Sequence, residues 1–428
     1  EEVIPEWESA MRALGERVRA GHDFLWRISQ PRREGPRVFH PGGDTHPGKN
    51  GPKPADDHRT SDPSGWETEE LAGFGVIFRN RPGTDRETYL AFKSGPNRGH
   101  FHGDQLSFHY AACATPVAVD HFCSYGPRAG QEHMHNRVAF ATDDLPYANM
   151  DGYERLIAFQ PGETADIAMG QVASDRLRHV TKLPPEDWDR DFPQKSFQTP
   201  LTYRRTVVQV TGGEQDYFVI RDQHAGQDLK AIYCLHAYGD KVTRDGNVID
   251  WDGLRLFVAA PRQFDYQRFD WSHENGGGQS TKGVRLKVEA AESEFITVLY
   301  PRIPTGEQTD PQQMEYRDSP MPEMEAIPGG VRVGEDEITF DGGIDEDAAT
   351  SYVTVKRDGR LVAELTGEQI DLTRPQGRVG LFVPNTGYPF GTIPNWLIRQ
   401  RVNVPDWARE FVGRHWPTRL ELERPEED

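Results

Sequence analysis

The chain has 428 residues, of which 36% are hydrophobic and 27% are charged, with 42 glycines and 32 prolines. So much glycine and proline excludes a coiled coil or a helical bundle and predicts many turns. The formal net charge of −19 disfavours a nucleic-acid partner, because an acidic chain repels polyanions. Three cysteines are too few for a disulfide scaffold, and no run approaches the roughly 18 apolar residues of a membrane-spanning helix.

The N-terminal part of the chain falls into two segments. Met11, Leu14 and Val18 repeat at helical spacing, which predicts a helical segment over 1–39. Residues 40–65 contain ten glycines or prolines in 26 positions. Such a stretch cannot bury enough apolar surface to order itself, so a linker or long loop is expected there.

The rest of the chain has a β pattern. Short runs rich in Val, Ile, Phe and Tyr follow one another between turn residues, which predicts an antiparallel β-sandwich over 66–310. A smaller C-terminal β region is expected over 311–428, where Asp358-Gly359 between two alternating runs is a strong hairpin signal. The predicted fold class is therefore mainly β, a large antiparallel β-sandwich followed by a smaller C-terminal β-domain.

Histidines are crowded into one part of the predicted sandwich. Six of the 15 histidines lie within 36 residues, namely His100, His102, His109, His121, His133 and His135. Histidine is the usual side chain for proton transfer near neutral pH and the commonest metal ligand. Residues 79–137 also hold seven Lys or Arg against five Asp or Glu, a local net charge of +2 in an acidic chain. The sequence therefore predicts a site for an anionic substrate in this segment.

Strand alternation indicates how some of these side chains meet. If the run over 100–108 is extended, His100 and His102 lie on its core face, near the strand's end. The next run, TPVAVD, ends in Asp120, and a further strand is expected to begin at His135. The three strand ends would bring two imidazoles and a carboxylate to one point, which suits one Zn²⁺ with an open fourth position. The alternative is that these are ordinary surface or hydrogen-bonded strand histidines.

The motifs around these residues resemble those of a known enzyme family. The run GHFHGDQLSF at 99–108 is followed by VAVD at 117–120, CSYG at 123–126 and HMHNRV at 133–138. Together they resemble the heparinase II/III-like polysaccharide lyases, and the strand sequences over 203–238 resemble that family more weakly. The resemblance covers roughly 66–310 and, more loosely, the C-terminal β region. It implies a lyase that cleaves a uronic-acid-containing polysaccharide by β-elimination.

The resemblance also implies roles for particular residues. The first histidine of the motif matches His100, a general acid or base, and Tyr125 is the candidate for its catalytic partner. The family's metal set matches His102, Asp120 and His135, which implies one zinc ion near the cleft. Independently of the resemblance, residue type makes Asn97, Arg98, Arg128, Asn136 and Arg137 the candidates for binding the substrate's carboxylate or sulfate.

One departure from the family concerns the N-terminus. The family has an α/α-toroid before the sandwich, whereas only a short helical segment, the expected end of a toroid, precedes the linker here. Either the chain is the C-terminal part of a longer product, which we favour, or the toroid is lost. In the first case the chain is an incomplete enzyme. A secreted or periplasmic location is expected, with a signal peptide absent or already removed, and a homodimer is left open.

Two other classes of protein remain open at this point. A non-catalytic carbohydrate-binding or structural β-module would use the metal only to stabilise the sandwich. A metal-dependent hydrolase would need two carboxylates flanking the scissile bond, and the cluster offers only Asp104 and Glu132 as spare carboxylates. The hydrolase therefore ranks third.

Overall fold

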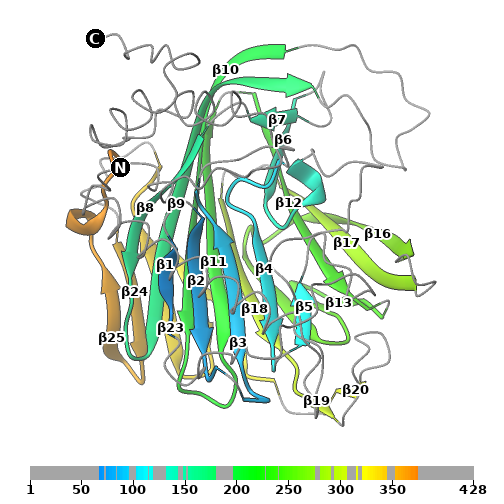
Figure 1. Cartoon of the computed structure of the whole chain (residues 1–428), viewed down its shortest axis with the longest axis vertical. Coiled ribbons are helices and arrows are strands. Elements are labelled where there is room, and N and C mark those ends of the chain that lie inside the picture. Colours follow the sequence, from blue (N-terminus) through cyan, green and yellow to red (C-terminus); the bar gives the residue numbers. More distant parts are fainter. Residues whose placement is uncertain are drawn as a thin grey trace, which may run out of the picture.

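The computed structural model describes the chain between residues 67 and 374, with gaps (Figure 1). The predicted helical segment over 1–39 and the linker over 40–65 lie outside the described residues. The described ranges are 67–71, 74–82, 84–95, 103–113, 115–118, 132–142, 148–150, 153–179, 196–226, 228–239, 241–274, 280–290, 294–305, 315–316, 321–344 and 352–374.

The first layer of the molecule is an antiparallel sheet that runs from β1 to β16. β5 and β6 both pair with the edge of β12 opposite β17, so they continue each other along that strand. In order across the layer the strands are β1 (Glu69–Leu71), β2 (Gly75–Asn80), β3 (Thr88–Lys93), β4 (Phe108–Ala112), β5 (Thr115–Ala118) with β6 (Val138–Ala141), β12 (Lys230–Tyr238), β17 (Ser280–Ala290) and β16 (Asp265–Glu274).

The second layer is also antiparallel and contains the two longest strands, β9 and β10. The short strand β7 (Ala148–Met150) pairs with the far end of β9 and touches β6, which joins the two layers. In order the other strands are β8 (Tyr153–Gln160), β9 (Ala165–His179), β10 (Ser196–Val210), β11 (Tyr217–Gly226), β18 (Glu294–Pro301), β15 (Leu254–Ala260), β14 (Val248–Asp250) and β13 (Thr243–Asp245).

The main core fills the space between these two layers, and it is rich in aromatic side chains. Phe78 and Tyr110 from the first layer both meet Phe218 of β11 edge to face, with ring centroids 5.7 and 5.0 Å apart. Burying such side chains stabilises the sandwich by about 1.5–3 kcal/mol for a large apolar residue. Apolar side chains from the predicted strand runs of both layers thus form a common core.

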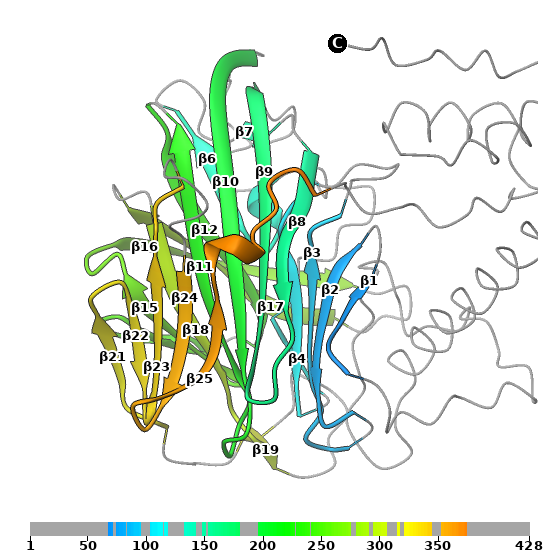
Figure 2. The ribbon, with the colours of Figure 1, turned by 90° about the vertical axis from the view of Figure 1, so that its left-hand side faces the viewer.

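A third layer covers the outer face of the second (Figure 2). The side chains between these layers include Val208 and Val219 from the sandwich and Phe340 and Val355 from the third layer. Its strands are β21 (Met324–Ile327), β22 (Gly330–Val333), β23 (Asp336–Asp341), β24 (Tyr352–Arg357) and β25 (Arg360–Leu365), and a small pair, β19 (Pro304–Thr305) and β20 (Glu315–Tyr316), lies apart.

The expected fold class is confirmed, and so is the hairpin between β24 and β25. Asp358 and Gly359 both have positive φ, 50° and 72°, as a tight turn between antiparallel strands requires. The helical turns in the described ranges are short 3₁₀ segments, η2 (Glu132–Met134) and η5 (Gly367–Gln369). No described helix is long and apolar enough to cross a membrane.

Two expected strand boundaries are wrong at the histidine motifs. β4 begins at Phe108, because the backbone over 103–107 makes a turn in which Ser107 N–H donates to the carbonyl oxygen of Asp104 at 3.0 Å. Leu106 has a φ of 58°, so an extended alternation does not continue through this turn. β6 likewise begins at Val138 and not at His135.

Candidate functional site

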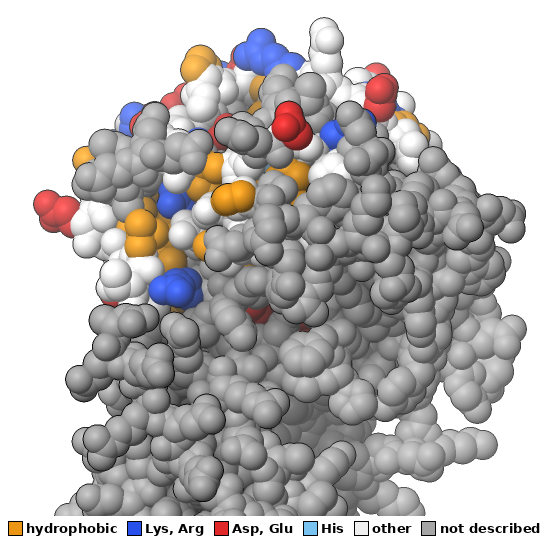
Figure 3. All heavy atoms as spheres, turned by 90° about the horizontal axis from the view of Figure 1, so that it is seen from above, with side chains coloured by type: hydrophobic (Ala, Val, Ile, Leu, Met, Phe, Trp, Pro, Cys, Tyr) orange, Lys and Arg blue, Asp and Glu red, His pale blue; other side chains and the backbone are white. Residues whose placement is uncertain are grey.

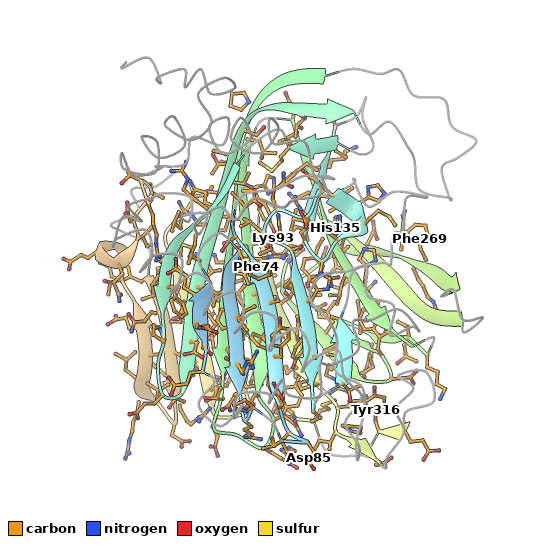
Figure 4. All side chains as sticks on the ribbon, in the orientation of Figure 1. Phe74, Asp85, Lys93, His135, Phe269 and Tyr316 are labelled. Carbon is orange, nitrogen blue, oxygen red and sulfur yellow. The ribbon has the colours of Figure 1, made fainter. Side chains whose placement is uncertain are left out.

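His135 of the second histidine motif lies in the same half of the molecule as Lys93, which pairs with Asp104 of the first motif. Figure 4 places Lys93, at the end of β3, and His135, just before β6, in the same half of the molecule, away from Asp85 and Tyr316. On the surface seen from above, basic, acidic and hydrophobic side chains are interspersed among the described residues (Figure 3).

Three of the ten candidate site residues, His135, Asn136 and Arg137, lie within the described ranges. The other seven lie outside them, which leaves the catalytic pair and two of the proposed metal ligands as predictions. Those seven are Asn97, Arg98, His100, His102, Asp120, Tyr125 and Arg128.

His135 follows the 3₁₀ turn η2 and is buried with it. Its side chain is 2% exposed, and its backbone N–H donates to the carbonyl oxygen of Glu132 at 3.1 Å. Burial raises the pKa of Glu132 to about 7, against the opposing effects of Arg137, the N–H of Met150 and His135. The carboxylate of Glu132 accepts the backbone N–H of Met150 and pairs with Arg137, so η2 is fixed on both sides of His135.

Arg137 joins the two motifs directly. Its Nη1 donates to the carbonyl oxygen of Gly103 at 3.0 Å and to Oε1 of Gln105 at 2.8 Å, while Nη2 lies 3.3 Å from Glu132. The guanidinium carbon lies 5.3 Å from the ring centre of Tyr203, and the residue has no exposed surface. These contacts give Arg137 a structural role, and its predicted role in substrate binding stays a prediction.

Asn136 holds the same segments from a second side. Its amide nitrogen donates to the carbonyl oxygen of Phe108 at 3.1 Å, and its amide oxygen accepts the backbone N–H of His236 at 2.7 Å. Nε2 of His236 in turn lies 3.2 Å from the carbonyl oxygen of His133. Asn136 is fully buried, so these bonds tie β4, β12 and the second motif together.

A buried ion pair of Arg205 and Asp222, to which the sequence pattern assigned no role, contacts both motifs. Nε and Nη2 of Arg205 donate to the two carboxylate oxygens of Asp222 at 2.6 and 3.0 Å, and Tyr203 donates to Oδ1 at 2.7 Å. Nη1 of Arg205 donates to the carbonyl oxygens of Leu106 and Asn136 at 2.7 and 2.6 Å. The available signal was an Arg and an Asp within the otherwise apolar strand sequences of β10 and β11.

A second ion-pair cluster, of Lys93, Asp104 and Glu154, borders the first motif. Nζ of Lys93 lies 2.9 Å from Asp104 and 2.7 Å from the fully buried Glu154. Burial disfavours the charge on Lys93, but the two carboxylates outweigh it and the pKa of Lys93 is raised. Asp104 and Glu132, the two carboxylates that a hydrolase would use, are thus both paired with a cation.

Within the described ranges no group of three or more His, Cys, Asp and Glu side chains is arranged to hold a metal ion. His135 is the one member of the proposed zinc set among these residues. The donor chemistry of the set, two imidazoles and a carboxylate, fits Zn²⁺.

No family model and no curated protein matches the sequence. Heparan sulfate lyase HepC from Pedobacter heparinus is similar in structure, with a TM-score of 0.47 and 15% identity, covering 72% of this chain and 44% of that one. The structure of heparinase III has a TM-score of 0.45 and 14% identity, covering 72% of this chain and 43% of that one. The 4-alpha-glucanotransferase from Thermococcus litoralis has a TM-score of 0.30 and 8% identity, covering 57% of this chain and 40% of that one.

A heparan sulfate lyase and heparinase III are thus among the structures to which this chain is similar. The chain spans less than half of the length of the structures that it matches.

Proposed function

We propose that this chain is the β-sandwich part of a polysaccharide lyase that cleaves a uronic-acid-containing polysaccharide by β-elimination. The observation that carries the proposal is the contact of Arg137 with Gly103 and Gln105. Gly103 directly follows His102, and Arg137 lies two residues after His135. The contact therefore supports a common site built from the two histidine motifs.

In this proposal the side chains of the chain move two protons. The C5 proton of a uronate is acidic only when the adjacent carboxylate is neutralised, and Arg98 and Arg128 are proposed to bind that carboxylate through their paired N–H groups. His100 and Tyr125 share the acid and base roles, one taking the C5 proton and the other donating a proton to the departing O4. The C4–O4 bond breaks as a C4–C5 double bond forms, and no water is consumed.

The proposal includes one zinc ion held by His102, Asp120 and His135. When bound it would supply positive charge beside the site. His135 is buried, and its imidazole together with that of His102 and the carboxylate of Asp120 would form a donor set that suits Zn²⁺. Asn97 and the two arginines named above remain the proposed contacts to an anionic polymer, and a secreted or periplasmic location is proposed because such polymers are extracellular.

A second candidate function is a non-catalytic carbohydrate-binding or structural module. The structural form of this alternative is favoured by the burial of Asn136 and Arg137, whose polar atoms bind other parts of the protein.

The two candidates are separated by assaying the product of the complete gene on a panel of uronate polysaccharides. A lyase releases unsaturated ends that absorb ultraviolet light. A binding module retains the polymer on an affinity gel without any rise in absorbance, and that result would reject the lyase.

A further inference from the structure

The turn between the first histidine motif and β4 has a backbone conformation that needs external support. Leu106 has a φ of 58°, in the left-handed region that residues with a Cβ rarely adopt. Such conformations persist only where the surrounding structure enforces them, and they cluster at functional sites. Leu106 is fully buried, and the next residue is held by two backbone hydrogen bonds, from Ser107 to Asp104 and from Lys93 to Ser107, each of 3.0 Å.

Two neighbours on the second layer enforce this conformation. Gly170 on β9 leaves room for the side chain of Leu106, since a Cβ at that position would lie 2.6 Å from Cδ2 of Leu106. Arg205, which pairs with Gly170 in the β9–β10 register, donates from Nη1 to the carbonyl oxygen of Leu106 at 2.7 Å. The side chain and the backbone of Leu106 are therefore both fixed from the same point of the second layer.

The same nitrogen of Arg205 also fixes the second histidine motif. Nη1 donates to the carbonyl oxygen of Asn136 at 2.6 Å, so one atom holds carbonyl groups from both motifs. The guanidinium cannot turn away, because Asp222 binds its other two nitrogens and is itself bound by the hydroxyl of Tyr203. Lysine could keep the charge but not this fork of donors.

We propose that Arg205, oriented by Asp222, is a positioning residue that sets the spacing between the segment following His102 and the segment containing His135. This inference rests on the proposed function for its meaning, since the two histidines are the proposed metal ligands. Arg205 lies beneath the site and acts through the two backbone segments. Its loss should therefore loosen those segments and weaken metal binding while the sandwich stays folded.

The strand itself supplies a matched control. Arg204 is the adjacent residue on β10, and its Nε and Nη2 donate to Oε1 of Gln171 at 3.0 and 2.9 Å. Successive residues of a strand point to opposite faces, so Arg204 points away from the core that contains Tyr203 and toward the third layer. Arg204 is 3% exposed, so Arg204→Lys makes the same substitution as Arg205→Lys at a position that is also buried.

The test measures amide hydrogen exchange and Zn²⁺ affinity on the full chain carrying Arg205→Lys, Asp222→Asn or Arg204→Lys. Losing a charge-assisted hydrogen bond should speed exchange at Ser107, His135 and His236 by about tenfold or more in the first two variants. Zn²⁺ affinity, measured by competition with a chelator, should fall about 10–100-fold, as when other groups that orient metal ligands are removed. Arg204→Lys should change neither quantity.

The inference is overturned if the amide protons of Ser107, His135 and His236 exchange at the parent's rates in Arg205→Lys and Asp222→Asn. It is equally overturned if β10 and β11 exchange faster by the same factor as the two motifs, because the ion pair would then serve only the stability of the sandwich. If Arg205→Lys fails to fold, Asp222→Asn, which keeps the arginine and nearly the same volume, decides between these outcomes. A parent protein that binds no Zn²⁺ would reject the proposed metal site, while the exchange rates would still decide the role of Arg205.

Discussion

Nη1 of Arg137 lies 3.0 Å from the carbonyl oxygen of Gly103, a residue 34 positions earlier in the chain. This contact brings the ends of two histidine motifs together although neither motif is part of a regular strand at that point. Arg137 and the neighbouring Arg205 are both fully buried cations. A buried charge is tolerated only where paired and hydrogen-bonded, so each arginine also fixes the groups that satisfy it.

Gly170→Ala should destabilise the protein by displacing Leu106. The added Cβ would lie 2.6 Å from Cδ2 of Leu106 and 2.9 Å from Cζ of Phe92, closer than side chains approach. Overpacking a filled core typically costs about 1–3 kcal/mol, measurable as a lower urea midpoint.

Gly213→Ala is the control for this change. Its Cβ would meet Gln215 O at 3.5 Å, an ordinary contact distance, so the urea midpoint should stay near that of the parent. Equal midpoints for the parent and Gly170→Ala would show that Leu106 is not seated against Gly170.

The ion pairs of Asp250 should make stability depend on pH in the acid range. Partial burial disfavours its charge, but hydrogen bonds from Arg255 and the charges of Arg255 and Arg302 outweigh it, and the pKa of Asp250 is lowered. A folded pKa below the unfolded one stabilises the protein above the ordinary Asp pKa of about 4, and this contribution is lost as the pH falls through the folded pKa.

Asp250→Asn should therefore be less stable than the parent at pH 7, with a difference that shrinks below about pH 4. Asp245→Asn, on the exposed strand β13, should match the parent throughout. Denaturant curves across this range test the prediction, and a difference that is constant with pH would contradict it.

Much of the fold could be predicted from the sequence because its strands are short, apolar on the core face and separated by turn residues. The hairpin at Asp358-Gly359 is local in origin, and it was predicted. The turn over 103–107 was not, since Leu106 adopts its conformation through Arg205 and Gly170, which are distant in sequence. Alternation alone favours an extended strand there, and a pattern of residue types cannot reveal a tertiary hydrogen bond that overrides it.

The candidate site shows the same division. The buried ion pair joins Arg205 of the dipeptide Arg204-Arg205 to Asp222 of the dipeptide Arg221-Asp222. The sequence does not tell which residue of each dipeptide faces the core. Asn136 and Arg137 were proposed from their residue types as substrate contacts, and the structure gives their polar atoms protein partners.

Removal of any one proposed zinc ligand should abolish metal binding. In His102→Ala, Asp120→Ala and His135→Ala we expect less than one tenth of the parent's bound zinc, because each removes a ligand of a three-residue set. Elemental analysis of protein purified without chelator checks this, with His109→Ala as the control that keeps its metal. A parent free of divalent metal would contradict the proposed set.

His100→Ala should lower the rate of β-elimination by about 10²–10⁴-fold while leaving zinc content and the urea midpoint unchanged, because it removes only a proton-transfer group. Tyr125→Phe, which deletes a single ionisable oxygen, should have a similar effect on kcat. Both changes are made in the product of the complete gene. Parental kcat in His100→Ala would reject the assignment, and loss of zinc would instead make His100 a ligand.

The most direct test of the proposed lyase is the composition of its product when a uronate polysaccharide is cleaved in ¹⁸O-labelled water. β-Elimination forms a C4–C5 double bond without adding water, so the account predicts an ultraviolet-absorbing product whose mass spectrum shows no ¹⁸O incorporated on cleavage. A saturated product carrying one ¹⁸O atom per cleaved bond would identify a hydrolase and contradict the account.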